Sequence, residues 1–216
     1  MSSSRTQRVA FQGEQGAFSE DAALKLLGPE IQLVPRRTFE ALFRSVDEGL
    51  ADYVLVPVEN SLIGAIQPAV DLLNKSSLGI VGEVAIQIRQ LLIGCSGAVF
   101  EQISAVESHP AALAQCGRFF AAHTHIRRIE TEDTAGSVAR IVQVGDRTRA
   151  AIAGRRAAEV YGGSILREGL EDRPENFTRF LLLSGQDKSN GQQIEKSKFD
   201  TNHVPDQQPK DINHDR

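Results

Sequence analysis

The chain has 216 residues, of which 41% are apolar, and its 24 basic and 28 acidic side chains give a net charge of −4, as in an ordinary globular protein. No apolar run approaches the ~18 residues of a membrane span, and no apolar core follows the polar start, so we expect a cytoplasmic protein without a signal peptide. Two cysteines cannot form a disulfide framework and lack metal-ligand spacing, and mild acidity gives no reason to expect nucleic acid.

The first half of the chain alternates between predicted strands and helices. Thr38 is positioned to cap a helix with apolar residues at three- and four-residue steps, and Ser19 is a candidate cap for the helix before it. Residues 53–58 are apolar on both faces, which is typical of a buried parallel strand. The predicted elements are strands at 8–12, 31–35 and 53–58, helices at 17–27, 38–50 and 66–73, and two strands within 80–95.

The same pattern repeats in the second half. Strands are predicted at 103–107, 126–130, 150–153, 164–168 and 177–184, and helices at 110–122, 134–144 and 155–161. Such alternation indicates a parallel α/β fold with right-handed crossovers. Two blocks joined by extended segments predict two lobes, with the last strands returning to the first lobe and a ligand cleft between them.

We divide the chain accordingly into an ordered unit at 5–185 and a tail at 186–216. Lobe 1 is expected at about 5–84 plus 166–185, and lobe 2 at about 85–165. The tail holds only four large apolar side chains, too few to offset the entropy of ordering it. We therefore predict that the tail is polar and disordered.

Candidate functional residues follow the strand ends, because ligands of open α/β sheets bind beyond the carboxyl ends of the strands. These positions are 12–19, 59–61, 107–110 and 133–137. The turn at Gly13 is neither a dinucleotide fingerprint nor a P-loop, which leaves a tight strand–helix turn or a loop that faces an anion. Ser108 and Gln115 lie two helical turns apart on one face. This spacing leaves open a cleft wall formed by both residues, or a serine that caps the helix and a glutamine that is exposed. His109 is interpreted as a helix-start residue, and no histidine spacing indicates a metal.

Residues 176–183, Asn-Phe-Thr-Arg-Phe-Leu-Leu-Leu, form the most unusual stretch. Strand alternation directs Thr178 and Phe180 to one face and Arg179 to the other. An arginine among apolar neighbours needs a carboxylate or solvent. The pattern alone leaves open a structural ion pair or a substrate clamp.

This stretch, with Asp172 upstream, resembles the Thr-Arg-Phe signature of the prephenate dehydratases. The resemblance covers about 7–185 and includes 12–19, Glu-Asn-Ser at 59–61, Ser-His-Pro at 108–110 with Leu-Ala-Gln at 113–115, and Asp-Thr-Ala at 133–135. Residues 11–19 are more similar to the arogenate dehydratase branch. Ile-Gly-Ala at 63–65 departs from the usual Gly-Gly-Ser, and Ala111 replaces a usual glutamine.

The resemblance implies a two-lobed, periplasmic-binding-protein-like (type II) α/β fold with the active site in the cleft. It implies decarboxylating dehydration of prephenate to phenylpyruvate, with arogenate as the alternative substrate, for phenylalanine synthesis without metal or cofactor. Cationic and N–H donors would hold the two carboxylates, and the substrate choice would depend on residues near 182–184. The alternative from another class is a non-catalytic two-lobed binder of small anions.

By the same resemblance, the Thr178 hydroxyl assists departure of the substrate hydroxyl, and Arg179 orders the site or holds a carboxylate. Glu59 orients the site or supplies the proton. The expected substrate-binding residues are Asn60, Ser61, Ser108, Gln115, Thr134 and Phe180. Most relatives carry a C-terminal regulatory ACT domain, whose pattern we do not find here, so we expect no allosteric control by phenylalanine. The expected partners are the small-molecule substrate and a second copy in a homodimer, and neither nucleic acid nor a membrane.

Overall fold

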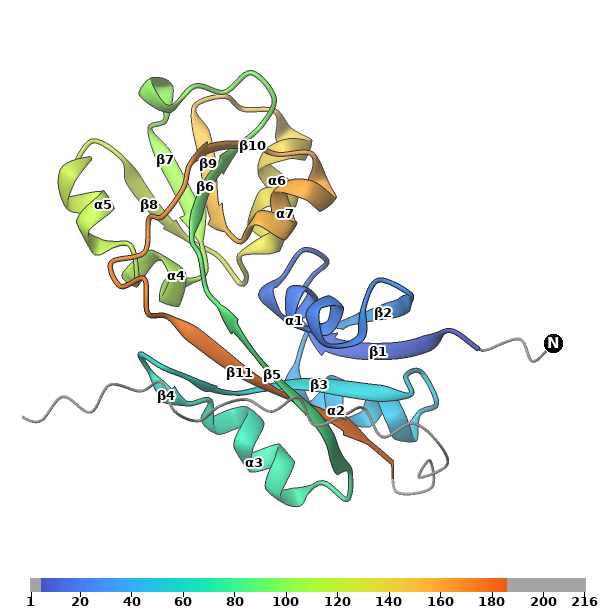
Figure 1. Ribbon diagram of the computed structural model, residues 1–216. Helices are drawn as coiled ribbons and strands as arrows, with labels where there is room; N and C mark the ends of the chain where they lie inside the picture. The colour runs from blue at the N-terminus through green and yellow to red at the C-terminus, as the bar shows by residue number, and fades with distance from the viewer. Residues whose placement is uncertain (1–4, 186–216) are drawn as a thin grey trace, which may run out of the picture.

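The computed structural model describes residues 5–185, which form two lobes joined by two crossovers (Figure 1). The predicted tail at 186–216 lies outside the described residues. Each lobe is built around one sheet, which fulfils the two-lobed α/β prediction. Strand β5 of the first lobe ends at residue 87, three residues beyond the predicted boundary at 84. Strand β10 of the second lobe ends at residue 167, two residues beyond the predicted boundary at 165.

Lobe 1 has a six-stranded sheet in the order β2-β1-β3-β11-β5, with β4 paired to β3. Helix α1 covers one face over a core that includes Phe11, Leu55 and Phe180, and α2 and α3 cover the other face over Val56 and Leu181. Its elements are β1 (Gln7–Gln12), α1 (Phe18–Leu27), β2 (Ile31–Arg36), α2 (Phe39–Asp47), β3 (Tyr53–Asn60), β4 (Gly64–Ala65), α3 (Gln67–Lys75), β5 (Gly79–Gln87) and β11 (Phe177–Ser184).

Lobe 2 has a five-stranded sheet in the order β10-β6-β9-β7-β8, and its core is a single apolar cluster. Its elements are β6 (Leu91–Gly94), the 3-10 turn η1 (Phe100–Gln102), β7 (Ala105–Ser108), α4 (Pro110–Ala114), α5 (Gly117–Ala122), β8 (Arg127–Glu130), α6 (Ala135–Val144), β9 (Arg149–Ala153), α7 (Arg155–Tyr161) and β10 (Ser164–Arg167).

The two sheets share one strand order and orientation. In lobe 1, β1 runs parallel to β2 and β3, and β11 is antiparallel to both β3 and β5. In lobe 2, β7 runs parallel to β8 and β9, and β6 is antiparallel to both β9 and β10. This repeated order, with the chain crossing twice between the lobes, is the type II architecture that the resemblance implied.

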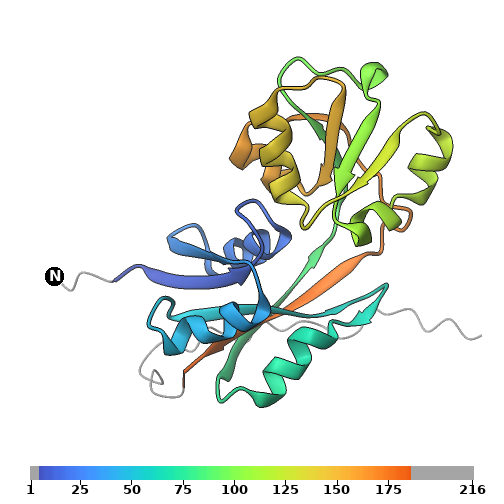
Figure 2. The same cartoon turned by 180° about the vertical axis from the view of Figure 1, so that it is seen from behind.

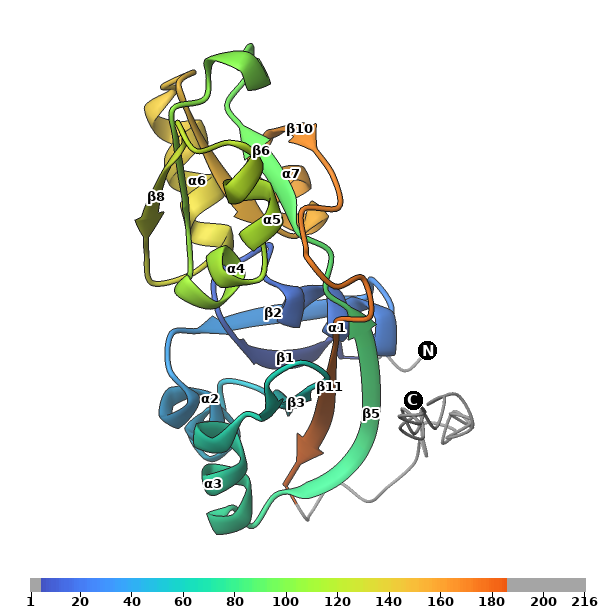
Figure 3. The same cartoon turned by 90° about the vertical axis from the view of Figure 1, so that its left-hand side faces the viewer.

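The crossovers lie side by side along one edge of the molecule (Figure 3). The backbone N–H of Ile88 donates to Asn176 O at 2.7 Å, and that of Leu170 donates to Gln90 O at 3.0 Å. The buried Glu171 carboxylate accepts from Gln90 N at 2.8 Å and from Arg89 at 3.2 Å. These bonds tie the two crossovers into one connection between the lobes.

Three local predictions need correction. The helix predicted at 110–122 is two helices, because the Asp172 carboxylate accepts from Gly117 N and Arg118 N, each at 2.8 Å, and so starts a new helix. Ser19 is not a cap, since Ala17 occupies that position and α1 has no side-chain cap. The strand at 53–58 is parallel on one side only, because β11 pairs antiparallel with β3. Thr38 does cap α2, accepting from Ala41 N at 3.2 Å.

Candidate active site

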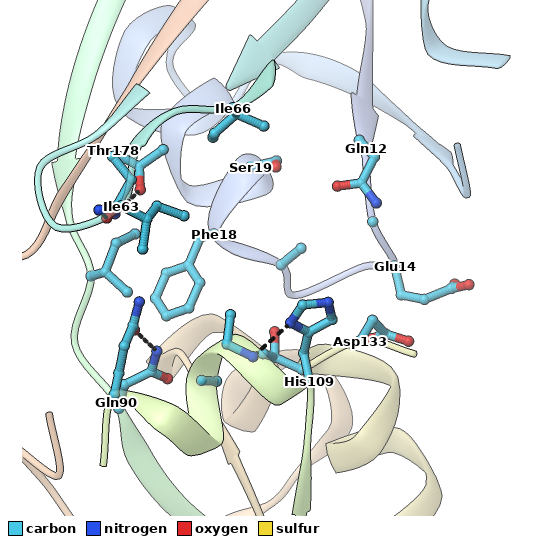
Figure 4. A pocket seen from close by; sticks show the side chains of 18 of the residues that line it. Gln12, Glu14, Phe18, Ser19, Ile63, Ile66, Gln90, His109, Asp133 and Thr178 are labelled. Carbon is cyan, nitrogen blue, oxygen red and sulfur yellow. Dashed lines mark hydrogen bonds between the residues drawn. The ribbon is translucent and has the colours of Figure 1, made fainter. Parts of the chain in front are cut away.

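A cavity of about 290 Å³ lies where the two lobes face each other. Figure 4 shows Thr178, Ile63 and Ile66 on one side of it and Gln90, His109 and Asp133 on the other. The lining residues are Gln12, Gly13, Glu14, Ala17, Phe18, Ser19, Asn60, Ile63, Ile66, Ile88, Gln90, His109, Ala111, Ala112, Gln115, Glu132, Asp133, Thr134, Thr178 and Phe180. Predicted site residues found here are Asn60, Gln115, Thr134, Thr178 and Phe180.

Thr178 and Asn60 form a cross-strand pair between β11 and β3. The Asn60 Oδ1 accepts from the backbone N–H of Leu62 at 3.0 Å and of Ile63 at 3.3 Å. This sets the orientation of the amide, so its Nδ2 donates to Thr178 Oγ1 at 3.0 Å. The threonine oxygen is therefore an acceptor in this pair. Its proton has no acceptor within residues 5–185, and the hydroxyl can donate into the cavity.

A chain of buried and half-buried amides continues from this pair to the second lobe. Asn60 Nδ2 also donates to Asn176 Oδ1 at 2.7 Å. The Gln115 Oε1 then accepts from Asn176 at 3.1 Å and from Gln90 at 3.1 Å. Gln90 Oε1 is buried without a partner among the described residues. Because these hydrogen-bonded amides connect both lobes through the crossovers, they hold the Thr178–Asn60 pair in a defined position relative to lobe 2.

Two helix starts, one from each lobe, lie at the cavity. Helix α1 begins at Phe18 and α6 begins at Ala135, and neither has a side-chain cap from its N-cap residue. The hydroxyls of Ser19 and Thr134 line the cavity and make no hydrogen bond within residues 5–185. Helix N-termini carry partial positive charge and unpaired N–H groups. The cavity thus offers neutral donors to an anion such as a carboxylate.

The resemblance implied cationic donors for the substrate carboxylates, but the charged side chains that line the cavity are acidic. Among the described residues that line it there is no arginine or lysine, whereas Glu14, Glu132 and Asp133 contribute carboxylates. One Asp133 oxygen accepts from Gly136 N at 2.5 Å, within the first turn of α6. His109 is the N-cap of α4, as predicted, and its Nδ1 accepts from Ala111 N. The ring also lines the cavity.

Arg179 and Glu59 lie on the opposite face of the sheet from Thr178 and outside the cavity. They are cross-strand partners, with Arg179 Nη2 at 3.3 Å from Glu59 and Nη1 at 3.6 Å from Glu83. Their side chains are 46% and 55% exposed. Of the two alternatives for Arg179, the structure therefore favours the ion pair over the clamp. Glu59 lacks the burial that a role as proton source would require.

Two predicted substrate-binding serines are engaged in the scaffold. Ser61 Oγ donates to Glu175 O at 2.8 Å and accepts from Phe177 N at 2.9 Å. Ser108 is fully buried, and its Oγ donates to Ile152 O at 2.6 Å across the sheet of lobe 2. Neither lines the cavity. Residues 182–184 are buried in the sheet of lobe 1 and do not line the cavity either.

Sequence reasoning missed several lining residues. Gln12, Phe18 and Ser19 belong to the stretch already singled out at 12–19, and their place at the end of β1 and just after it was a usable signal. Gln90 lies between two strands in a stretch without a motif. Ile63, Ile66 and Ile88 make an apolar side with Phe18 and Phe180. No spacing rule connects these residues, since they come together only through the folding of the two lobes.

The described residues contain no helix long and apolar enough to cross a membrane, and no group of three or more potential metal ligands. A two-lobed α/β chain with hydroxyls, amides and helix N-termini around an interlobe cavity has the architecture of proteins that bind small molecules between two lobes. The model of the family described as prephenate dehydratase matches residues 9–188. The chain belongs to that family.

Similar proteins fall into both branches suggested by the motifs. Arogenate dehydratase 1 of Petunia hybrida is 42% identical over 180 residues, covering 83% of this chain and 42% of that protein. A bifunctional chorismate mutase/prephenate dehydratase of Neisseria gonorrhoeae is 36% identical over 189 residues, covering 84% and 52%. The chain thus spans about half the length of the curated relatives it matches.

Solved structures agree with the fold. Prephenate dehydratase from Arthrobacter aurescens in complex with L-Phe has a TM-score of 0.73 at 29% identity, covering 82% of this chain and 60% of that one. A protein described as a quorum-quenching acylase has a TM-score of 0.75 at 31% identity, covering 83% and 64%. Proteins of this architecture therefore have more than one described activity, and the activity has to be inferred from the residues of the site.

Proposed function

We propose that the chain catalyses the decarboxylating dehydration of prephenate to phenylpyruvate, a step of phenylalanine biosynthesis. The observation that carries the proposal is the Thr178 hydroxyl, whose oxygen accepts from Asn60 and whose proton has no acceptor within residues 5–185. A hydroxyl held in this way can donate to a leaving group. The family membership and the neutral donors at the helix starts support the same reaction.

In this reaction the bond between C1 and its carboxylate breaks, and CO₂ leaves. The bonding electron pair enters the ring, which becomes aromatic as the C4–O bond breaks toward the hydroxyl oxygen. That oxygen takes up a proton and leaves as water. Thr178 donates a hydrogen bond that strengthens as negative charge grows on the departing oxygen. Aromatisation drives the reaction, and no electrons are exchanged with a cofactor.

The cavity offers a place for each part of the substrate. Phe18, Phe180 and the isoleucines form the side against which a ring can pack. The helix starts at Phe18 and Ala135, with the hydroxyls of Ser19 and Thr134, supply donors for carboxylates. Holding the substrate between these groups places its C4 oxygen at Thr178, which lowers the entropy cost of reaching the transition state.

Arogenate is the second candidate substrate, and the acidic lining favours it. Arogenate has an ammonium where prephenate has a keto group, so it bears one more positive charge. Glu14, Glu132 and Asp133 line the cavity, without a lysine or arginine among the described lining residues. Carboxylates attract an ammonium and repel a dianion. This favours arogenate, as does the 42% identity to a Petunia arogenate dehydratase.

Amide hydrolysis, as in the acylase neighbour, fits the site less well. That reaction would need a nucleophile activated by an adjacent base. Within residues 5–185, Thr178 Oγ1 has no hydrogen bond to a histidine or carboxylate, and its bonding partner is the Asn60 amide nitrogen, which is a donor. An amide that donates to the hydroxyl does not remove its proton.

The deciding experiment compares kcat/KM for prephenate, followed by the alkaline absorbance of phenylpyruvate, and for arogenate, followed by phenylalanine release. Turnover of either supports the dehydratase, and the ratio assigns the substrate. If Glu132 selects the ammonium, Glu132→Gln lowers kcat/KM for arogenate and leaves or raises that for prephenate. A folded protein that binds prephenate without turnover would instead establish the small-anion binder.

A further inference from the structure

The lobes meet at a second place besides the crossovers, where the start of α1 faces α7 (Figure 2). Glu20 of α1 is only 2% exposed. Its Oε1 accepts from Arg156 Nε of α7 at 2.8 Å, and its Oε2 accepts from the backbone N–H of Gly16 at 2.9 Å. Arg156 also contacts Glu159 at 3.3 Å. A buried carboxylate of lobe 1 is therefore paired with an arginine of lobe 2.

Two glycines bring the facing surfaces into close contact. A Cβ on Gly16 would lie 2.7 Å from the Ala157 Cα, and a Cβ on Gly154 would lie 2.8 Å from the Phe18 ring. Real Cβ atoms do not approach so closely, so a side chain at Gly16 would displace the backbone of α7, and one at Gly154 would displace the Phe18 ring. The fit of loop 13–19 against α7 thus depends on the absence of side chains at this contact.

The same loop also lines the cavity, through residues that include Gly13, Glu14, Phe18 and Ser19. One side of the loop contacts lobe 2 and another side faces the ligand. Glu20 contacts both the loop, at Gly16, and lobe 2, at Arg156. The Glu20–Arg156 pair therefore connects the loop that lines the cavity to lobe 2.

We propose that Glu20 and Arg156 form an interlobe latch, which holds the lobes closed and sets the position of loop 13–19 for substrate binding. They are positioning residues and do not touch the substrate. The proposal rests on the proposed function of the cavity. Replacing Arg156 leaves the Glu20 carboxylate buried with only the Gly16 N–H as a partner within residues 5–185, which is strongly unfavourable. Replacing Glu20 leaves Arg156 in contact with Glu159 but without its partner in lobe 1. Separation of the lobes admits water to the group that remains.

The latch predicts a specific kinetic pattern. If only the closed form binds substrate, apparent affinity falls in proportion to the closed fraction. We expect Glu20→Gln and Arg156→Gln each to raise KM about tenfold, with kcat within about threefold, because the saturated enzyme is closed again. The double variant should be no worse than the worse single variant, since the two side chains act as a unit.

Arg155→Gln is the matched control. Arg155 precedes Arg156 on the same helix, and its ion pair with Glu168, at 2.6 Å, is exposed and joins α7 to the start of the second crossover rather than to α1. This variant should keep the KM of the parent protein. If Arg156→Gln fails to fold, Arg156→Lys keeps the charge while losing the planar donor, and should raise KM to an intermediate value.

A readout independent of turnover is the distance between the lobes. Spin labels at Leu50→Cys in lobe 1 and Val144→Cys in lobe 2 occupy exposed positions, while Cys95 and Cys116 are 3% and 0% exposed and should label poorly. Pulsed electron spin resonance should show one short distance in the latched protein and a longer, broader distribution in Glu20→Gln and Arg156→Gln.

The outcomes separate the latch from the proposed reaction. Longer distances support the latch even if neither prephenate nor arogenate is turned over, and in that case only the proposed function fails. Unchanged distances overturn the latch, including when the melting temperature falls. A loss of kcat at constant KM also overturns it, because it would place the pair in the chemical step rather than in binding.

Discussion

The Thr178 hydroxyl and the Arg179 side chain, on neighbouring residues of β11, face opposite sides of the sheet, and a pair of substitutions tests that difference. Thr178→Val removes the donor at nearly equal volume, so kcat should fall about 10²–10³-fold while KM changes only a few-fold, because a lost transition-state donor costs that much. Thr178→Ser should retain much of the rate. Steady-state kinetics with the preferred substrate measure both.

The matched control is Arg179→Gln on the next residue. Arg179 pairs with Glu59 and Glu83, and all three side chains are about half exposed; such pairs contribute little to stability. Its kcat and KM should stay within about twofold of the parent protein. A Thr178→Val variant with unchanged kcat, or an Arg179→Gln variant with a large loss, would reverse the assignment of the two faces.

Asp21, next to the latch, gives a pH-dependent prediction. Burial raises the pKa of Asp21 from 3.8 to about 6, Glu159 and Glu20 add to the rise, and Arg156 opposes it. Because the folded pKa lies above the unfolded one, the native state binds more protons between about pH 4 and 6, and stability is lost as pH rises through 6.

Asp21→Asn removes this penalty. At pH 7.5 the variant should be more stable than the parent protein by on the order of 1 kcal/mol, allowing for the partly exposed side chain. The advantage should shrink as pH falls from 6 to 4. Urea unfolding at several pH values measures it, and an advantage that is the same at every pH would contradict the assignment to Asp21.

At the scale of elements, sequence signals predicted structure that depends on nearby residues. They failed where a residue distant in sequence determines where a helix ends. Thr38 caps its own helix, so the signal lies within a few residues and the prediction holds. The break in the predicted helix at 110–122 depends on Asp172, which is 55 residues from Gly117. No periodicity within the helix can reveal that. Asp172 in the family signature thus shapes the segment that carries Gln115.

Asp172→Ala tests this long-range cap. The carboxylate accepts from two backbone N–H groups at the start of α5, and loss of such a cap costs about 1–2 kcal/mol. We expect a lower midpoint of urea unfolding for Asp172→Ala and a smaller loss for Asp172→Asn, which keeps one oxygen. Equal stability of both variants and the parent protein would show that α5 does not depend on Asp172.

For the molecule as a whole, the alternating pattern predicted the two lobes and the return of the last strands, but not the contacts between lobes. Thr178, Asn60 and Thr134 were found through motifs in the resemblance. The amide chain through Gln90 and the Glu20–Arg156 pair join positions far apart in sequence. Their partners are identifiable only once both sheets are in place.

The two lobes differ in how they are connected, and this predicts different folding behaviour. The sheet of lobe 2 is formed by one continuous segment, from Leu91 to Arg167. The sheet of lobe 1 is completed only by β11, which lies between β3 and β5 and pairs with both. Without β11, β5 has no partner in its sheet and much of the apolar face contributed by Phe180 to Leu183 is missing.

We therefore expect a fragment of residues 88–172 to fold by itself and a fragment of residues 5–87 to remain unfolded. Joining residue 87 to residue 173 by a short Gly/Ser linker should restore lobe 1, because Gln87 Nε2 already bonds to Pro174 O at 2.6 Å. Circular dichroism and urea titration of the three proteins measure this. Cooperative unfolding of the 5–87 fragment would show that the lobe does not depend on β11. Failure of the linked form would instead show that lobe 1 needs lobe 2, through the latch and the crossovers, to fold.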